Sequence, residues 1–240
     1  MTPTPQSRVP EERKRRRPTR SGVVLSAETI VGKALELIDA QGDEALTVRR
    51  LGAALGADPS AVYRYFRNTD DLLLAVADRL IAESLDGFEP GALEGGWAAD
   101  LREFGLRAYG CAQRHPRVAA LTTTRVTRRP HEYRAVDTGV GLLLRAGFGP
   151  EEAVRHYHAF IDTVLGHAAL DAAVLRLPAE QRAGDERAWE DAYTRLPADT
   201  YPHLHAARAH LPVMAGSAFE PALDLLIEAL VARAPRAPEG

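Results

Sequence analysis

The chain has 240 residues, of which 45% are hydrophobic and 26% are charged. These values are typical of a soluble globular protein with one large domain or two smaller ones. Cys111 is the only cysteine, which excludes an internal disulfide and a zinc site built from several cysteines. No apolar run approaches the roughly 20 residues of a membrane-spanning helix, and the polar, arginine-rich N-terminal residues predict no secretory signal. We therefore expect a cytoplasmic protein without membrane contact.

The net charge of −3 is unevenly distributed along the chain. Residues 1–70 carry 12 Lys and Arg and 9 Asp and Glu side chains, whereas residues 71–240 carry 18 and 24. A basic front end on an acidic body indicates a polyanionic partner for the front end alone. The alternative is a basic segment that only aids solubility.

Residues 1–24 contain four prolines, the basic run 13–17 and few apolar groups. This composition predicts a tail that is disordered when free. Such a tail can follow phosphates or enter a minor groove, as basic arms do. Ser26 then caps a first helix, which ends at Gly42.

The stretch over residues 47–66 predicts two short helices joined by a tight turn. Gly56 follows the first helix, where a residue tolerant of the left-handed conformation is needed. Asp58 is a suitable N-cap for the second helix, and Pro59 follows where a missing N–H costs least. Two helices in this arrangement, with aromatic and basic residues outward, are typical of a DNA-binding helix-turn-helix. The outward residues of the second helix are Ser60, Tyr63, Arg64 and Arg67.

Beyond Phe66 the hydrophobic periodicity predicts helices throughout and no sheet. One amphipathic helix is capped by Asn68 or Thr69 and reaches about Leu85. Glycines and prolines then cluster over 87–96, which indicates a domain junction. Further helices are expected at about 97–114, 116–125, 130–147, 151–176 and 217–233, with partial helix and a long loop over 178–215.

Four pieces of sequence carry a resemblance to a known family: Thr47-Val48-Arg49-Arg50-Leu51, Leu55-Gly56-Ala57-Asp58, Ala61-Val62-Tyr63-Arg64-Tyr65-Phe66 and Asp71-Leu72-Leu73. Through them, residues 26–85 resemble the DNA-binding domain of the TetR family of transcriptional repressors. The later stretches over 142–148 and 157–167 look like tetracycline-repressor-type C-terminal domains.

The resemblance implies an all-α homodimer. We expect a disordered basic tail over 1–24, and an N-terminal three-helix helix-turn-helix domain over 25–86 whose last helix links it to the second domain. A C-terminal helical bundle over 87–240 would bind a small molecule and dimerise, through helices near 151–176 and 217–233. No P-loop, GxSxG or HExxH motif is present, so we expect no enzyme.

The resemblance also assigns roles to the candidate DNA-binding residues. Arg49 falls where it can reach a guanine edge, which arginine bonds through both O6 and N7. Pro59, Ser60 and Tyr63 are expected closest to the base edges. The candidates for phosphate contacts, which position the protein without reading sequence, are Thr47, Arg64, Tyr65, Arg67 and Thr69.

Two of these positions depart from the family pattern. Tyr65 stands where family members often carry histidine, and Thr69 stands where a lysine often contacts the DNA backbone. The basic tail would compensate for the missing charge at Thr69. A structural reading remains open for Tyr63 and Tyr65 as half-buried amphipathic residues, and for Arg49 as part of a solvated face.

Histidines and aspartates on the long helix leave two readings open. His158 and Asp162 are four residues apart, as are His167 and Asp171, so each pair shares a helix face. Such pairs suit a divalent metal, or they are histidines oriented by a carboxylate in the bundle or at a dimer contact. Two ligands on one helix need a third from elsewhere, so we predict no metal and no cofactor. The candidate ligand-binding residues are Trp97, Phe104, Tyr109, His158, Asp162 and His167.

The sequence thus predicts a ligand-responsive transcriptional regulator that acts as a repressor. It would bind a pseudo-palindromic operator in double-stranded DNA as a homodimer, and a small-molecule inducer would release it. The alternatives are control by a protein partner or a metal ion, and activation in place of repression.

Overall fold

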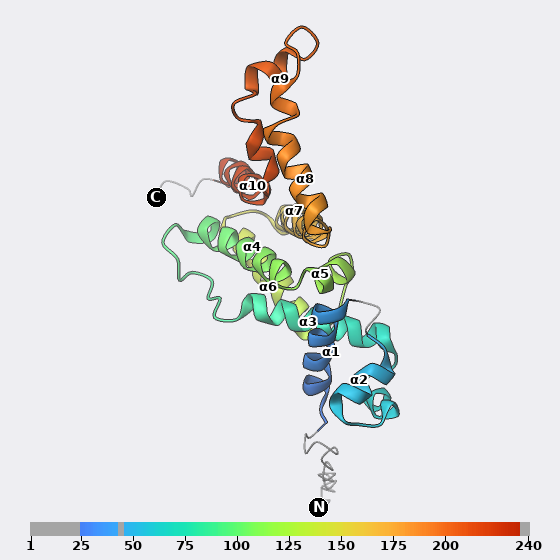
Figure 1. Ribbon diagram of the computed structural model, residues 1–240. Coiled ribbons are helices and arrows are strands. Elements are labelled where there is room, and N and C mark those ends of the chain that lie inside the picture. The colour runs from blue at the N-terminus through green and yellow to red at the C-terminus, as the bar shows by residue number, and fades with distance from the viewer. Residues whose placement is uncertain (1–24, 43–45, 236–240) are drawn as a thin grey trace, which may run out of the picture.

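A computed structural model describes residues 25–42 and 46–235. The described part is helical and contains no strand, which confirms the predicted all-α class (Figure 1). The predicted basic tail lies outside the described residues. The elements are α1 (Ala27–Gln41), α2 (Val48–Leu55), η2 (Pro59–Arg64), α3 (Thr69–Leu85), α4 (Gly96–Arg114), α5 (Pro116–Thr122), α6 (Pro130–Arg145), α7 (Pro150–Leu175), α8 (Ala179–Glu190), η3 (Tyr193–Arg195), α9 (Pro202–Ala207), η4 (Leu211–Ala215) and α10 (Phe219–Arg233).

Short polar side chains start the first helices, as the sequence predicts. The Ser26 hydroxyl accepts a hydrogen bond from the Thr29 N–H at 3.1 Å. The Thr47 hydroxyl accepts one from the Arg50 N–H, and the Asn68 amide oxygen accepts one from the Asp71 N–H. Each bond satisfies a backbone donor that has no partner inside the helix. Asn68 therefore caps α3, and Thr69 is its first residue.

The core of the N-terminal unit is built on α1, α2, η2 and α3. Ile38, Leu51, Val62 and Val76 are almost completely buried in it. The same cluster continues into α4 and α5, through residues such as Val118. Helix α3, which follows η2, is therefore packed against both parts of the chain, so a shift of α3 must involve both.

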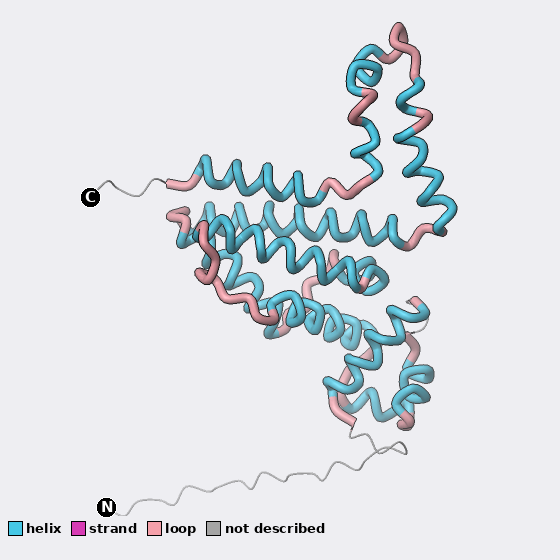
Figure 2. The backbone as a smooth tube through the Cα atoms, turned by 60° about the vertical axis from the view of Figure 1, so that its left-hand side comes forward, coloured by secondary structure: helices cyan, strands magenta, loops and turns pink. Residues whose placement is uncertain are grey.

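A second core joins α4, α6, α7 and α10. Phe104, Leu142, Phe160 and Leu223 are its central members. Figure 2 shows α10 running alongside α7, with the N-terminal unit on the opposite side of the bundle. By length and composition, α7 is the only helix in the described ranges apolar enough to cross a membrane, and 22% of its most apolar window is buried. Core helices of soluble proteins pass the same test, and α7 packs on α4, α5, α6 and α10.

The segment over 178–215 differs from the predicted partial helix and long loop. It folds into α8, η3, α9 and η4, which project from the bundle as an arm (Figures 1 and 2). Pro202 stands at the first position of α9, where its missing N–H costs nothing. None of the residues in these four helices is buried.

Candidate nucleic-acid interface and ligand cavity

Two glycines set the crossing of α2 and η2. Gly56 ends α2 in the left-handed conformation, with φ of 62° and ψ of 31°, as predicted. Gly52 faces η2 so closely that an added Cβ would lie 3.0 Å from the Cα of Pro59. A side chain at Gly52 would therefore push η2 away from α2 and change the angle between the helices.

Asp58 caps η2 and fixes the first outward side chain. One of its carboxylate oxygens accepts the Ser60 N–H at 2.8 Å and the Ser60 hydroxyl at 2.6 Å. The hydroxyl bond is the main reason why the pKa of Asp58 is lowered. Because the Ser60 hydroxyl hydrogen is engaged, its lone pairs remain to accept a hydrogen bond from a donor on a base edge, such as an amino group.

Burial divides η2 into an inner and an outer face, as the sequence predicts. Ala61 and Val62 are buried, whereas Tyr63 is 55% exposed. The Tyr63 hydroxyl and the Arg49 guanidinium form no hydrogen bond with any described residue. The candidate DNA contacts that are exposed are Thr47, Arg49, Pro59, Ser60, Tyr63, Arg64 and Arg67.

Tyr65 and Thr69 lie differently from the other candidates. The Tyr65 hydroxyl donates to the Leu25 carbonyl at 2.7 Å, and the ring packs on the first core. This hydroxyl is thus used to hold the segment before α1, and not left free for a phosphate. Thr69 is half-buried, and its hydroxyl has no partner among the described residues.

Two arginines tie the first turn of α3 to the loop between α5 and α6. Arg125 forms a paired contact with both carboxylate oxygens of Asp70, at 2.8 and 3.0 Å. Arg129 donates to the Asp71 carboxylate at 2.6 Å and to its carbonyl at 3.0 Å. These bonds connect the bundle to the residues that directly follow η2.

A third connection lies in the middle of α3. Asp78 is 7% exposed, and one carboxylate oxygen accepts the N–H groups of His131 and Glu132 at 3.1 Å. Its other oxygen lies 2.8 Å from Nδ1 of His131. An α3 side chain therefore satisfies the N-terminus of α6, where a negative charge is favourable.

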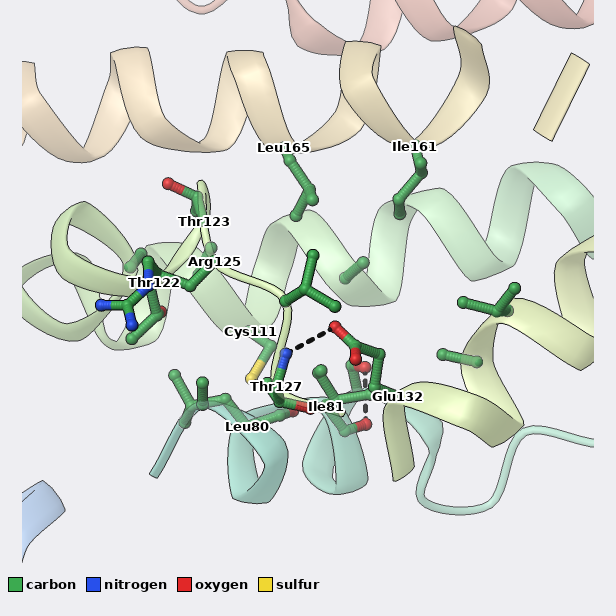
Figure 3. A pocket seen from close by; sticks show the side chains of 18 of the residues that line it. Leu80, Ile81, Cys111, Thr122, Thr123, Arg125, Thr127, Glu132, Ile161 and Leu165 are labelled. Carbon is green, nitrogen blue, oxygen red and sulfur yellow. Dashed lines mark hydrogen bonds between the residues drawn. The ribbon is translucent and has the colours of Figure 1, made fainter. Parts of the chain in front are cut away.

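The connecting loop also walls a cavity. A cavity of about 430 Å³ lies between α3, α4, α6 and α7, and residues 122–127 form one side of it. In Figure 3, Ile161 and Leu165 point from α7 toward the side of Leu80 and Ile81. The volume falls within the range of small-molecule sites, and the lining is mostly apolar, as in such sites.

Three of the six predicted ligand-binding residues line this cavity. Phe104 does so from α4, and His158 and Asp162 do so from α7. His158 Nε2 and the Asp162 carboxylate are 3.1 Å apart. Both side chains are largely exposed, so this pair stands at the rim of the cavity.

The other three are used elsewhere. Trp97 packs edge-on against Phe148, with ring centroids 6.3 Å apart. Tyr109 stacks on Phe219 at 3.9 Å, and its hydroxyl donates to Asp171 at 2.6 Å. Trp97, Tyr109 and His167 do not line the cavity. The expected pairing of His167 with Asp171 is absent from the described hydrogen bonds and ion pairs, and Asp171 instead accepts from Tyr109 and Ser217 through one carboxylate oxygen.

Candidate metal ligands occur only in pairs in the described part of the chain. No group of three or more His, Cys, Asp or Glu side chains there is close enough to hold a metal ion. Cys111 lines the cavity, where burial raises the pKa of its thiol to about 11.

Several cavity residues were not identified from the sequence. The loop over 122–127 and Glu132 line the cavity, although neither showed a motif. Tyr157 also lines it, and it was not among the six candidates. Their meeting depends on the packing of α6 against α7, for which no local pattern exists.

Comparisons with known proteins agree with this architecture. Residues 30–76 match the bacterial regulatory proteins of the tetR family, and residues 89–234 match the tetracyclin repressor-like C-terminal domain. An HTH-type transcriptional regulator of Saccharopolyspora erythraea is 26% identical over 208 residues, which cover 87% of this chain and 79% of that protein. The tetracycline repressor protein class A from transposon 1721 of Escherichia coli is 29% identical over 213 residues, covering 87% and 92%.

A solved structure shows the same fold with a bound ligand. The Streptomyces coelicolor TetR family protein ActR in complex with (S)-DNPA superimposes with a TM-score of 0.72 at 26% identity, covering 88% of this chain and 98% of that one. The relatives are transcriptional regulators and not enzymes, which confirms the predicted lack of enzymatic activity. The chain belongs to the TetR family of bacterial transcriptional regulators.

Proposed function

We propose that the protein is a cytoplasmic repressor that binds a pseudo-palindromic operator as a homodimer and leaves it when a small molecule occupies the cavity. The observation that carries this proposal is a continuous set of bonds between that cavity and the first turn of α3, directly after the reading helices. The names of its relatives support repression, and the ligand-bound ActR structure supports small-molecule control.

The DNA-reading roles follow the exposed face of α2 and η2. Arg49 would bond a guanine, and Pro59, Ser60 and Tyr63 would lie nearest to the base edges. Thr47, Arg64, Arg67 and Thr69 would hold phosphates. Tyr65 is left out of this set, because its hydroxyl is bonded to Leu25.

Exposed apolar side chains on α7 and α10 support dimerisation through these helices. Leu170 is 61% exposed and Leu225 is 67% exposed. Leucines left in water on two long helices favour burial against a second copy, as a four-helix bundle would provide. The arm over 178–215 has no buried residue, so it too would gain stability from a partner surface.

The loop between α5 and α6 would couple the ligand to DNA. Residues 122–127 line the cavity, while Arg125 and Arg129 hold the start of α3. A ligand that favours one arrangement of this loop would shift α3. This would change the separation of the two helix-turn-helix units in the dimer. The ligand can change the free-energy difference between the two arrangements by no more than the difference in its binding free energy for them.

Selection of bound fragments from random double-stranded DNA tests the proposal. We expect a recovered site with two inverted half-sites about one helical turn apart. Light scattering should give a mass of two chains for the free protein, and Leu170→Glu with Leu225→Glu should give one. Recovery of DNA without any shared sequence, or a monomer bound to a single half-site, would contradict the proposal.

A further inference from the structure

A tyrosine hydroxyl in the cavity lacks a hydrogen-bond partner. Tyr157 lines the cavity from α7 and is only 7% exposed. Its hydroxyl forms no hydrogen bond with any described residue. Although the residue as a whole is buried, the hydroxyl oxygen is not sealed from solvent, so it is open to a hydrogen-bonding group that enters the cavity. A ligand atom beside Tyr157 would supply this bond.

The position of Tyr157 is fixed by a glycine on the neighbouring helix. A Cβ added to Gly139 would lie 2.2 Å from a ring carbon of Tyr157. The ring therefore lies directly on the backbone of α6, where only glycine leaves room. This contact holds the hydroxyl in place before any ligand arrives, so a ligand that uses it pays little ordering cost.

Glu132 supplies a negative charge to the same cavity. Its two carboxylate oxygens accept the N–H groups of Thr127 at 3.0 Å and Arg128 at 2.7 Å. It forms no ion pair with a described residue, and each oxygen can accept a further hydrogen bond. Figure 3 shows the Glu132 carboxylate within the space between α3 and α7. Burial, and then the charge of Glu132, raise the pKa of Tyr157, so the hydroxyl keeps its hydrogen.

The other charged groups of the lining are already paired. Arg125 is bound to Asp70, and His158 lies beside Asp162 at the exposed rim. Glu132 is thus the one charge of the lining without a partner of opposite sign in the described part of the chain. The rest of the wall is mainly apolar.

We propose that Tyr157 and Glu132 form the polar end of the ligand site and select a largely apolar molecule that carries a hydroxyl or a protonated amine, while rejecting carboxylates. The amine or hydroxyl would donate to Glu132, and a hydroxyl oxygen would also accept from Tyr157. This inference rests on the proposed function in taking the cavity as the ligand site.

Four naphthalene probes that differ in one substituent test this preference. 2-Naphthalenemethanol, 2-naphthylmethylamine, 2-naphthaleneacetate and 2-methylnaphthalene are titrated into the full-length protein by calorimetry. We expect the alcohol and the amine to bind at least about tenfold more tightly than the acetate, since each hydrogen bond to a charged group contributes a factor of that order. Tyr157→Phe should weaken the alcohol about three- to tenfold and leave 2-methylnaphthalene unchanged.

Matched variants identify the groups responsible. Glu132→Gln should remove the preference for the amine over the acetate, whereas Glu151→Gln, at an exposed α7 position, should keep it. Tyr133→Phe removes a hydroxyl outside the cavity lining and should change no affinity. Equal binding of all four probes, binding of none up to 1 mM, or the same affinities in Tyr157→Phe would each overturn the proposal.

Operator binding separates this proposal from the proposed function. Tyr157→Phe is expected to bind the selected operator with unchanged affinity when no probe is present. If the wild-type protein binds its operator while the probes show no preference, only the ligand chemistry is refuted. If the wild-type protein selects no operator but the probe preference holds, the assignment of Tyr157 and Glu132 as the polar end of the ligand site is supported and the repressor function is refuted.

Discussion

Gly139→Ala tests the close contact that positions Tyr157. The new methyl group would lie 2.2 Å from a carbon of the buried ring, a distance that side-chain carbons do not reach. Either the ring or the α6 backbone must move, and both belong to the second core. Gly141→Ala on the same helix is the matched control, because its nearest neighbour would be the flexible end of Arg145 at 3.8 Å.

The expected size follows from two opposing effects. Overpacking of a filled core costs about 1–3 kcal/mol, and a contact this short places the cost near the upper end. Both substitutions gain about 1 kcal/mol of helix propensity. The gain cancels between the two variants, so Gly139→Ala should be less stable than Gly141→Ala by about 2–3 kcal/mol.

Thermal unfolding at equal protein concentration measures this difference. For a chain of this length, about 2–4 °C of Tm corresponds to each kcal/mol, so Gly139→Ala should melt about 4–12 °C below Gly141→Ala. Gly139→Ala should also weaken binding of 2-naphthalenemethanol, because the displaced hydroxyl no longer meets it. Equal melting temperatures would refute the close approach of Tyr157 to α6.

Three further predictions concern the thiol, the loop and the tail. Cys111 is buried with a pKa raised to about 11, so its thiolate fraction at pH 8 is about 0.001. A disulfide reagent should therefore modify the native protein more than about a hundredfold more slowly than the urea-unfolded chain. Equal rates would contradict the burial of this thiol. Arg129→Met removes both bonds to Asp71 and should lower Tm by about 1–4 °C. Arg155→Met, whose partner Glu151 has a side chain that is 84% exposed, should leave Tm within about 1 °C. Identical shifts in the two variants would refute a structural role for the loop contact. Deletion of residues 1–20, which hold seven Lys and Arg side chains, should weaken operator binding and reduce its salt slope by about 0.9 for each phosphate that the tail neutralises; an unchanged slope would mean that the tail does not touch phosphates.

Features set by neighbouring residues could be predicted from the sequence. Ser26, Thr47 and Asn68 cap their helices as expected, because a cap bonds an N–H only two or three residues away. Gly56 adopts the left-handed conformation that the turn needs. The inner and outer faces of η2 follow from helical periodicity in the same way.

Features that depend on residues far apart in the sequence could not be predicted. The motif left Tyr65 open as a phosphate contact or a half-buried residue, and the hydrogen bond that decides between them is to Leu25, 40 residues earlier. The contact of Gly139 with Tyr157 arises where α6 and α7 cross, and neither residue shows a local pattern. The ligand prediction therefore found part of the cavity and missed its polar end.

The affinity of Tyr63→Ala for the selected operator tests the central claim most directly. Tyr63 is 55% exposed and free of hydrogen bonds to described residues, so its removal should leave the fold and the dimer intact. We predict at least about a tenfold loss of operator affinity, while Tyr201→Ala, an exposed tyrosine of the arm, binds like the wild-type protein. A Tyr63→Ala dimer that binds the operator with wild-type affinity would contradict the assignment of η2 as the DNA-reading helix.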